Sequence, residues 1–192
     1  MYFKITNESE NHHGLQYHDG LIEDILPFQK EGSCVPGGIY FTLVKYIPRF
    51  LNYGIWIREV QIPEDAKMVQ DPEGEKWRAS KVILGSRKDL REVETWKYLV
   101  QQGVDIHADN DLVLRYLASN GHLEVLKYLV QQGVDIRANN DEALRSAAFN
   151  GHLEVLKYLV QQGADIHANN DLALRSSALY GHLEVLKYLV QQ

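Results

Sequence analysis

The residues best suited to do chemistry lie in the first forty positions of the chain. Cys34 stands in GSCVPGG, beside a glycine-rich turn, and His12, His13 and His18 precede it. A histidine could deprotonate the thiol and Asp19 could orient that histidine, which would make Cys34 a thiolate nucleophile. A plainer interpretation fits equally: Cys34 is a small buried hydrophobic residue in a tight turn, and the histidines belong to a solvated loop.

No known catalytic motif supports the first interpretation. The sequence contains no G-x-S-x-G, H-E-x-x-H, P-loop or kinase signature. We therefore favour a structural role for Cys34 and expect neither a catalytic residue nor a cofactor.

A second group of histidines recurs in one phrase, GHLE, as His122, His152 and His182. Histidine is a common metal ligand, but three copies in one repeated phrase favour a role in connecting helices. The single cysteine excludes an intrachain disulfide and every zinc site that needs two cysteines. We expect no metal site, and a reducing compartment such as the cytoplasm.

Composition narrows the class of partner. The chain has 192 residues, of which 45% are hydrophobic and 24% charged, with a net charge of −6. Residues 1–90 hold 11 basic and 13 acidic residues, and residues 91–192 hold 9 and 13. Because neither half is basic, we expect no nucleic-acid partner. No run of 18 apolar residues occurs and the start lacks signal-peptide features, so we expect no membrane partner.

The second half is built from a repeated unit. GHLEVLKYLVQQ recurs at 121–132, 151–162 and 181–192, an interval of 30 residues that is typical of a stacked solenoid. Within this phrase, Leu123, Leu126, Leu129 and Val130 fall on one face of a helix. Gly121 is the expected carboxyl cap of an earlier helix, because glycine adopts the left-handed conformation without steric cost.

That earlier helix is predicted at 111–120, with counterparts at 141–150 and 171–180. Each begins with an acid, Asp111, Asp141 or Asp171, that can cap or complement a helix start. The segments between the units, such as GVDIHADN, are led by glycine and rich in Asn and Asp, which predicts extended loops or turns.

The phrase GHLEVLKYLVQQGADIHA resembles the ankyrin repeat. The resemblance covers 103–132, 133–162 and 163–192, and VETWKYLVQQG resembles the end of a partial repeat at 93–102. It implies a stack of helix pairs that binds proteins. The period is shorter than the usual 33 residues, so the connecting loops should be short. Together with the leader GSCVPGGIYFT, the repeats resemble the ankyrin family of mimivirus-like giant viruses, which implies a host cytoplasm.

Two sets of residues are candidates for partner binding. In ankyrin proteins the end of the first helix contributes to binding, and the repeats differ from one another at that end. His107, Arg137 or His167 stands where the family usually has asparagine. The alternative for Phe149, Leu179 and Tyr180 is that they pack against neighbouring repeats or the first domain. The variable helix-end positions are Ser119, Asn120, Phe149, Asn150, Leu179 and Tyr180.

Residues 1–90 show a different pattern, rich in aromatic and β-branched residues. They predict strands at 2–6, 37–43, 53–62 and 81–85, a short helix within 42–53 broken near Pro48, and a helix over 86–100. We interpret this region as a small α+β domain that caps the stack. The predicted fold is thus an α+β domain followed by an all-α ankyrin solenoid over 91–192, with shortened connecting loops.

Two classes of function follow. The favoured class is a non-enzymatic protein–protein interaction module, a viral adaptor or effector. The alternative is a targeted enzyme, in which residues 1–90 modify a substrate that the repeats recruit. Because the final GHLEVLKYLVQQ matches the internal ones and solenoid ends normally carry a polar face, we also expect self-association through the last repeat, or a longer natural array.

Overall fold

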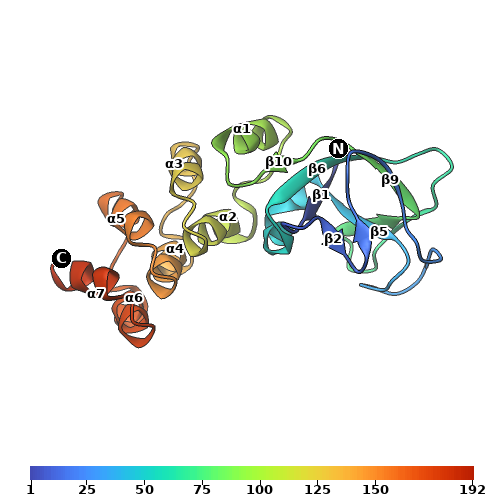
Figure 1. Cartoon of the computed structure of the whole chain (residues 1–192). Helices are drawn as coiled ribbons and strands as arrows, with labels where there is room; N and C mark the ends of the chain where they lie inside the picture. Colours follow the sequence, from blue (N-terminus) through green and yellow to red (C-terminus); the bar gives the residue numbers. More distant parts are fainter. The chain divides into compact units, whose positions relative to one another are not determined.

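A computed structural model describes residues 1–192. Strands fill the first part of the chain and helices the second, as the sequence predicts (Figure 1). The chain divides into two compact units, Met1–Asp105 and Ile106–Gln192. The helix α1, Val93–Gln101, lies in the first unit. Its assignment to a partial repeat and the predicted boundary at residue 90 stay predictions.

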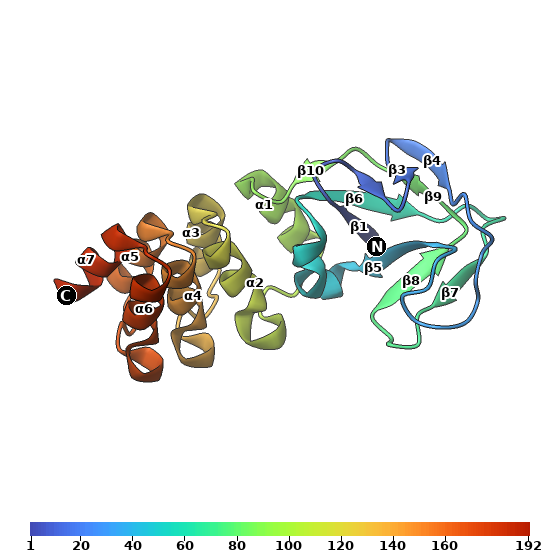
Figure 2. The same cartoon turned by 60° about the horizontal axis from the view of Figure 1, so that its bottom comes forward.

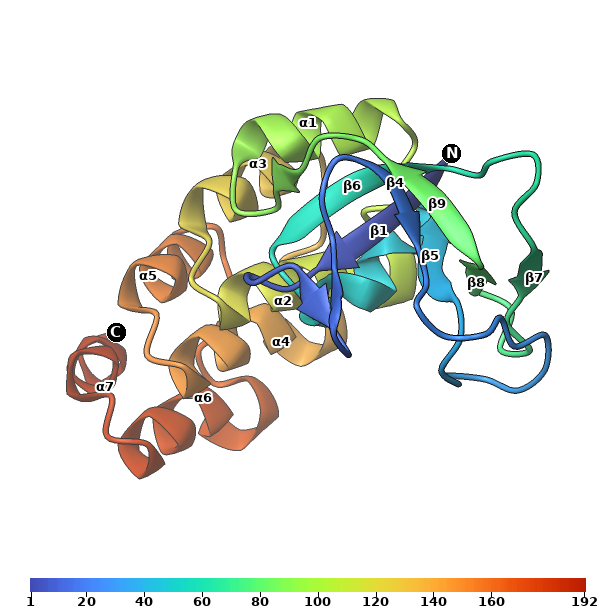
Figure 3. The ribbon, with the colours of Figure 1, turned by 45° about the vertical axis from the view of Figure 1, so that its right-hand side comes forward.

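The first unit is organised around an eight-stranded antiparallel sheet. The strands run in the order β4-β9-β6-β1-β5-β8-β7 (Figure 3). The strand β10 also pairs with β6. A separate two-stranded hairpin joins β2 and β3. The strands are β1 Tyr2–Thr6, β2 Asn11–His12, β3 Leu15–Gln16, β4 Gly20–Glu23, β5 Ile39–Leu43, β6 Trp56–Gln61, β7 Met68–Gln70, β8 Lys76–Ala79, β9 Lys81–Leu84 and β10 Lys88–Asp89.

The strand β1 lies in the middle of the sheet and is covered on both faces. Phe3 and Ile5 point to one face, as their spacing of two requires, and both are buried. Lys4 and Thr6 point to the other face and are buried as well. One face of the sheet packs into an apolar core that includes Tyr17, Ile22, Ile39, Phe41, Val60, Ala79, Val82 and Leu84.

The sequence located the three longest strands, β1, β5 and β6, and also β9, but it misjudged two helices. The segment Val44–Tyr53 is a 3₁₀ helix that continues through Pro48 and buries it, so the expected break is wrong. The predicted helix over 86–100 begins only at Val93, because Lys88 and Asp89 pair with β6. In α1 the ring of Tyr98 lies edge-on to Phe3, with 6.4 Å between centroids.

The second unit consists of three helix pairs. The first helices pack in one row, with α4 between α2 and α6, and the second helices form another row (Figure 2). None of the helices combines the length and apolar content needed to cross a membrane. The pairs are α2 Ala108–Ser119 with α3 Leu123–Gln131, α4 Ala138–Phe149 with α5 Leu153–Gln161, and α6 Ala168–Leu179 with α7 Leu183–Val190.

The buried face of each second helix differs slightly from the predicted one. In α3 the fully buried side chains are Val125, Leu126 and Leu129, whereas Leu123 and Val130 are only partly buried. The glycine before each second helix has a φ of +73° to +76°, which confirms the predicted left-handed cap.

Each first helix, as bounded above, opens with three residues in left-handed conformation, and the segment before it contains turns, one of the two forms that the sequence predicted. In the second repeat, Asn139, Asn140 and Asp141 all have left-handed backbone angles, with φ between 53° and 57°. The same three positions do so in the other repeats. Asn and Asp tolerate this conformation better than other residues with a Cβ atom, which explains why the segments are rich in them.

Candidate functional sites

An exposed apolar patch lies at the carboxyl ends of α4 and α6. Its residues are Phe149, Leu179 and Tyr180, whose exposed fractions are 44%, 77% and 52%. The rings of Phe149 and Tyr180 are 4.3 Å apart between centroids. We call these three residues the repeat patch. Phe149 and Tyr180 thus pack against each other across neighbouring repeats, as the alternative interpretation expected, while all three side chains stay exposed.

The equivalent polar residues are tied to their own helices. The side-chain amides of Asn120 and Asn150 donate to the backbone oxygens of Tyr116 and Ser146, at 2.8 and 2.9 Å. Tyr180 occupies the same place in the third repeat. Ser119, the counterpart of Phe149 and Leu179, is partly buried. The patch thus belongs to the second and third repeats only.

The second predicted set lies at the other end of the first helices. His107, Arg137 and His167 precede α2, α4 and α6, and each contacts the aspartate four residues later, at 2.8, 3.5 and 2.6 Å. The hydrogen bond to Asp171, the largest cause, raises the pKa of His167. The structure therefore does not bring these residues into the repeat patch.

The aspartates join neighbouring repeats. Asp141 is 2% exposed, and its carboxylate accepts a hydrogen bond from the backbone N–H of Asp165 in the next repeat, at 2.8 Å. Asp111 accepts in the same way from Asp135, at 3.3 Å. The sequence predicted acids that cap or complement a helix start. Asp111 and Asp141 do lie in the first turns of α2 and α4, but no cap hydrogen bond forms and their carboxylates accept from the following repeat.

The GH histidines also join repeats. The Nε2 atom of His152 lies 3.0 Å from the backbone oxygen of Ser119, and that of His182 lies 2.8 Å from the oxygen of Phe149. A Cβ atom on Gly121 would come within 2.7 Å of the His152 ring, so glycine is needed there. These contacts confirm the structural interpretation of the phrase.

Cys34 is exposed, contrary to the expectation that it is buried. Its sulfur accepts a hydrogen bond from the ammonium of Lys76 at 2.9 Å. The predicted base and orienting acid are engaged elsewhere: His18 contacts the backbone oxygen of Asp19 at 2.8 Å, and the Asp19 carboxylate pairs with Arg58. A turn that places Cys34 in left-handed conformation, with φ of 52°, keeps its side chain at the surface.

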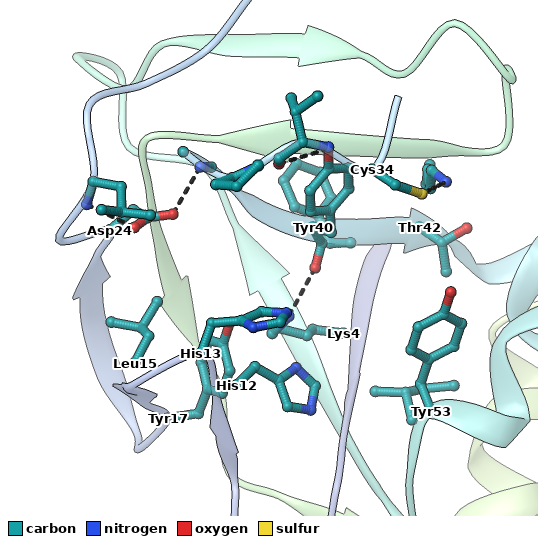
Figure 4. A pocket seen from close by; sticks show the side chains of 18 of the residues that line it. Lys4, His12, His13, Leu15, Tyr17, Asp24, Cys34, Tyr40, Thr42 and Tyr53 are labelled. Carbon is teal, nitrogen blue, oxygen red and sulfur yellow. Dashed lines mark hydrogen bonds between the residues drawn. The ribbon is translucent and has the colours of Figure 1, made fainter. Parts of the chain in front are cut away.

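A pocket of about 490 Å³ in the first unit does contain several of the candidates. Cys34, His12 and His13 all line it, but neither histidine makes a hydrogen bond to the sulfur (Figure 4). Burial, followed by the charges of Lys4 and His13, lowers the pKa of His12. The pocket also contains Lys4, which sequence reasoning missed because a lysine in a strand is normally exposed.

Because Cys34 is exposed, its replacement should change stability little. We expect Cys34→Ser to alter the free energy of unfolding by less than about 0.5 kcal/mol, as for other surface substitutions. Urea unfolding followed by tryptophan fluorescence measures this, since Trp56, Trp77 and Trp96 all lie in the first unit. A loss of more than about 1.5 kcal/mol would show that the contact with Lys76 stabilises the fold.

The fold and the sequence both define an ankyrin-type repeat protein. Residues 88–170 and 139–192 match the family model for ankyrin repeats, described as three copies. The matched residues make up more than half of the chain, which belongs to the ankyrin-repeat family. Ankyrin repeats imply protein–protein interaction, the class of partner that the sequence predicts.

Relatives come from a giant virus, as the resemblance implied. Two ankyrin-repeat proteins of Acanthamoeba polyphaga mimivirus are 40% and 46% identical over 130 and 136 residues, or 65% and 64% of this chain. These matches cover 64% and 44% of the relatives, so the chain spans less than two thirds of their length. A third mimivirus protein is 42% identical over 132 residues, 65% of this chain and 94% of that protein.

Proposed function

We propose that the chain is a viral adaptor or effector that binds a host or viral protein through the repeat patch, in the cytoplasm of the host cell. The observation that carries the proposal is that Phe149, Leu179 and Tyr180 are all exposed at the carboxyl ends of α4 and α6, with the rings of Phe149 and Tyr180 in contact. Aromatic residues that can be desolvated on binding dominate the energy of many protein interfaces. The family and the viral relatives support the class of function.

The position of the repeat patch also supports the proposal. The patch lies where the repeats differ in sequence, whereas the positions that hold the stack together, such as His152 and Gly121, are the same in every repeat. A linear stack has no enclosed pocket, so recognition depends on such a surface. Replacement of the three residues of the repeat patch should therefore affect binding more than folding.

The test uses the triple variant Phe149→Ser, Leu179→Ser, Tyr180→Ser. A partner is first purified from an amoebal lysate with the full chain, and its affinity is then measured with both proteins pure. We expect the variant to bind about 100-fold more weakly, because two or three contact residues typically supply that much energy.

The matched control replaces the equivalent lysine on the second helix of each of the three repeats, Lys127, Lys157 and Lys187, with serine. The first two are partly exposed and the third is exposed. Each of them forms only a surface ion pair with the glutamate three residues earlier. The control should bind with unchanged affinity, and circular dichroism should show both variants folded. Equal affinities for the patch variant and the full chain would refute the proposal.

A second candidate is the targeted enzyme, and one observation favours it. Cys34, His12 and His13 line one pocket of the first unit. Incubation of the purified partner with the full chain distinguishes the two functions. An adaptor leaves the partner's mass unchanged, whereas an enzyme changes it and Cys34→Ser prevents the change.

A further inference from the structure

Lys4 is a buried amine in the wall of the first unit's pocket. It comes from the middle of β1 and is 5% exposed. Its Nζ donates one hydrogen bond, to the backbone oxygen of Tyr40 at 3.0 Å, and lies 4.4 Å from the centre of the Tyr17 ring. Figure 4 shows Lys4 in the middle of the labelled side chains, with His12 and His13 to one side and Tyr53 to the other. An ammonium has three donors, so this one can make further hydrogen bonds.

No carboxylate pairs with Lys4. The acid of the pocket, Asp24, accepts hydrogen bonds from the backbone N–H groups of Leu26 and Gly38. The other buried cations differ, since Arg58 pairs with Glu10 and Arg78 lies 3.7 Å from a carboxylate. Burial lowers the pKa of Lys4 to about 7, and the charge of Asp24 opposes this only in part. An unpaired buried charge destabilises a fold, so a lysine at this place is better explained by a ligand than by stability.

The remaining wall of the pocket is mainly apolar. Phe3, Leu15, Ile25, Leu26 and Phe41 contribute to it. The volume of about 490 Å³ lies within the range of small-molecule sites. Of the two lysines that line it, Lys76 pairs with Glu73 and Lys4 has no carboxylate partner. An apolar cavity with one unpaired ammonium suits a ligand that has an apolar body and one negative charge.

We propose that this pocket binds a small monocarboxylate with an apolar body, whose carboxylate accepts hydrogen bonds from the Nζ atom of Lys4. A phosphate carries more charge than one buried ammonium can balance, whereas a carboxylate matches it. Lys76 at the pocket's edge is already paired with Glu73 at 2.9 Å, so Lys4 is the cation that remains for the ligand. This site lies in the first unit and does not depend on the function proposed for the repeats.

The test measures binding of octanoate and 3-phenylpropanoate to the full chain by calorimetry, with 1-octanol as the neutral match. At about pH 6 most of Lys4 carries its proton. We expect both carboxylates to bind at least tenfold more tightly than 1-octanol. In Lys4→Met, which keeps an unbranched side chain about the length of the lysine's apolar stem and removes the charge, the carboxylates should bind at least tenfold more weakly and 1-octanol should bind as before.

Lys67→Met is the control, because Lys67 is exposed and does not line the pocket. It should leave all affinities unchanged. The proposal fails if neither carboxylate binds at millimolar concentration, if 1-octanol binds as tightly as octanoate, or if Lys4→Met binds octanoate like the unaltered chain. The comparison with 1-octanol needs no variant, so it remains decisive even if Lys4→Met does not fold.

Discussion

Replacing Arg78 with methionine is expected to lower the free energy of unfolding of the first unit by about 4 kcal/mol, the cost of breaking a buried charged network. The side chain is fully buried. It donates to the backbone oxygens of Gln29, Glu31 and Gly32 and to the Tyr40 hydroxyl, at 2.7 to 2.9 Å. Methionine would leave all four acceptors without this donor.

The same replacement would also leave Asp71 as a buried carboxylate without its guanidinium neighbour, which lies 3.7 Å away. Urea unfolding followed by tryptophan fluorescence measures the loss in the first unit. Arg91→Met is the matched control, because that side chain is partly exposed and pairs at the surface with Asp89. We expect the control to lose less than about 1 kcal/mol. Equal losses of unfolding free energy in the two variants would show that the hydrogen bonds of Arg78 to residues 29–32 do not stabilise the first unit.

Replacing Asp141 with alanine is expected to destabilise the repeats by about 3 kcal/mol, because it removes a buried charged acceptor between two repeats. The backbone N–H of Asp165 would lose its partner, and the guanidinium of Arg137 would lose the nearer of its two carboxylates, 3.5 Å away, while keeping that of Asp165 at 3.7 Å. Because every tryptophan lies in the first unit, helical circular dichroism reports this change.

Asp171 provides an internal control for this prediction. It stands at the equivalent position of the third repeat, but its side chain is 50% exposed and contacts His167. Asp171→Ala should therefore cost less than about 1 kcal/mol. If the two variants lose the same free energy, the contact between repeats is not what Asp141 contributes.

The repeats could be predicted from the sequence because their core depends on local spacing. A period of 30 and the apolar positions of GHLEVLKYLVQQ determine helix pairs that stack on copies of themselves. What this spacing cannot show is the backbone conformation between the pairs. The left-handed triplet at Asn139, Asn140 and Asp141 depends on the packing of both flanking helices, and Asn and Asp are compatible with several turn types.

The first unit was harder to predict because its contacts are distant in sequence. Lys4 reads as an exposed strand residue until β1 is known to lie in the middle of the sheet, covered on both faces. Cys34 reads as buried until its turn is known to place it at the surface. In both cases the position of the strand or turn in the fold decides whether the side chain is buried or exposed. Strands of two residues, such as β2 and β3, also leave little pattern in the sequence.

The repeat patch was located by comparing the repeats with one another. Positions that differ among near-identical units are not required by the stack, and two of the three patch residues are aromatic. The structure adds that all three are exposed and that the two rings are in contact. The residues at the other helix end, His107, Arg137 and His167, are instead engaged with aspartates.

Photo-crosslinking from Leu179 tests the central claim most directly, because its side chain is 77% exposed and lies in the repeat patch. A photoreactive phenylalanine derivative is placed at residue 179 of the full chain, and separately at Lys187 as a control on the second helix of the same repeat. The account predicts that the purified partner crosslinks to residue 179, that excess unaltered chain suppresses the crosslink, and that residue 187 gives little product. A partner that still binds but crosslinks only to residue 187, or to both positions equally, would contradict it.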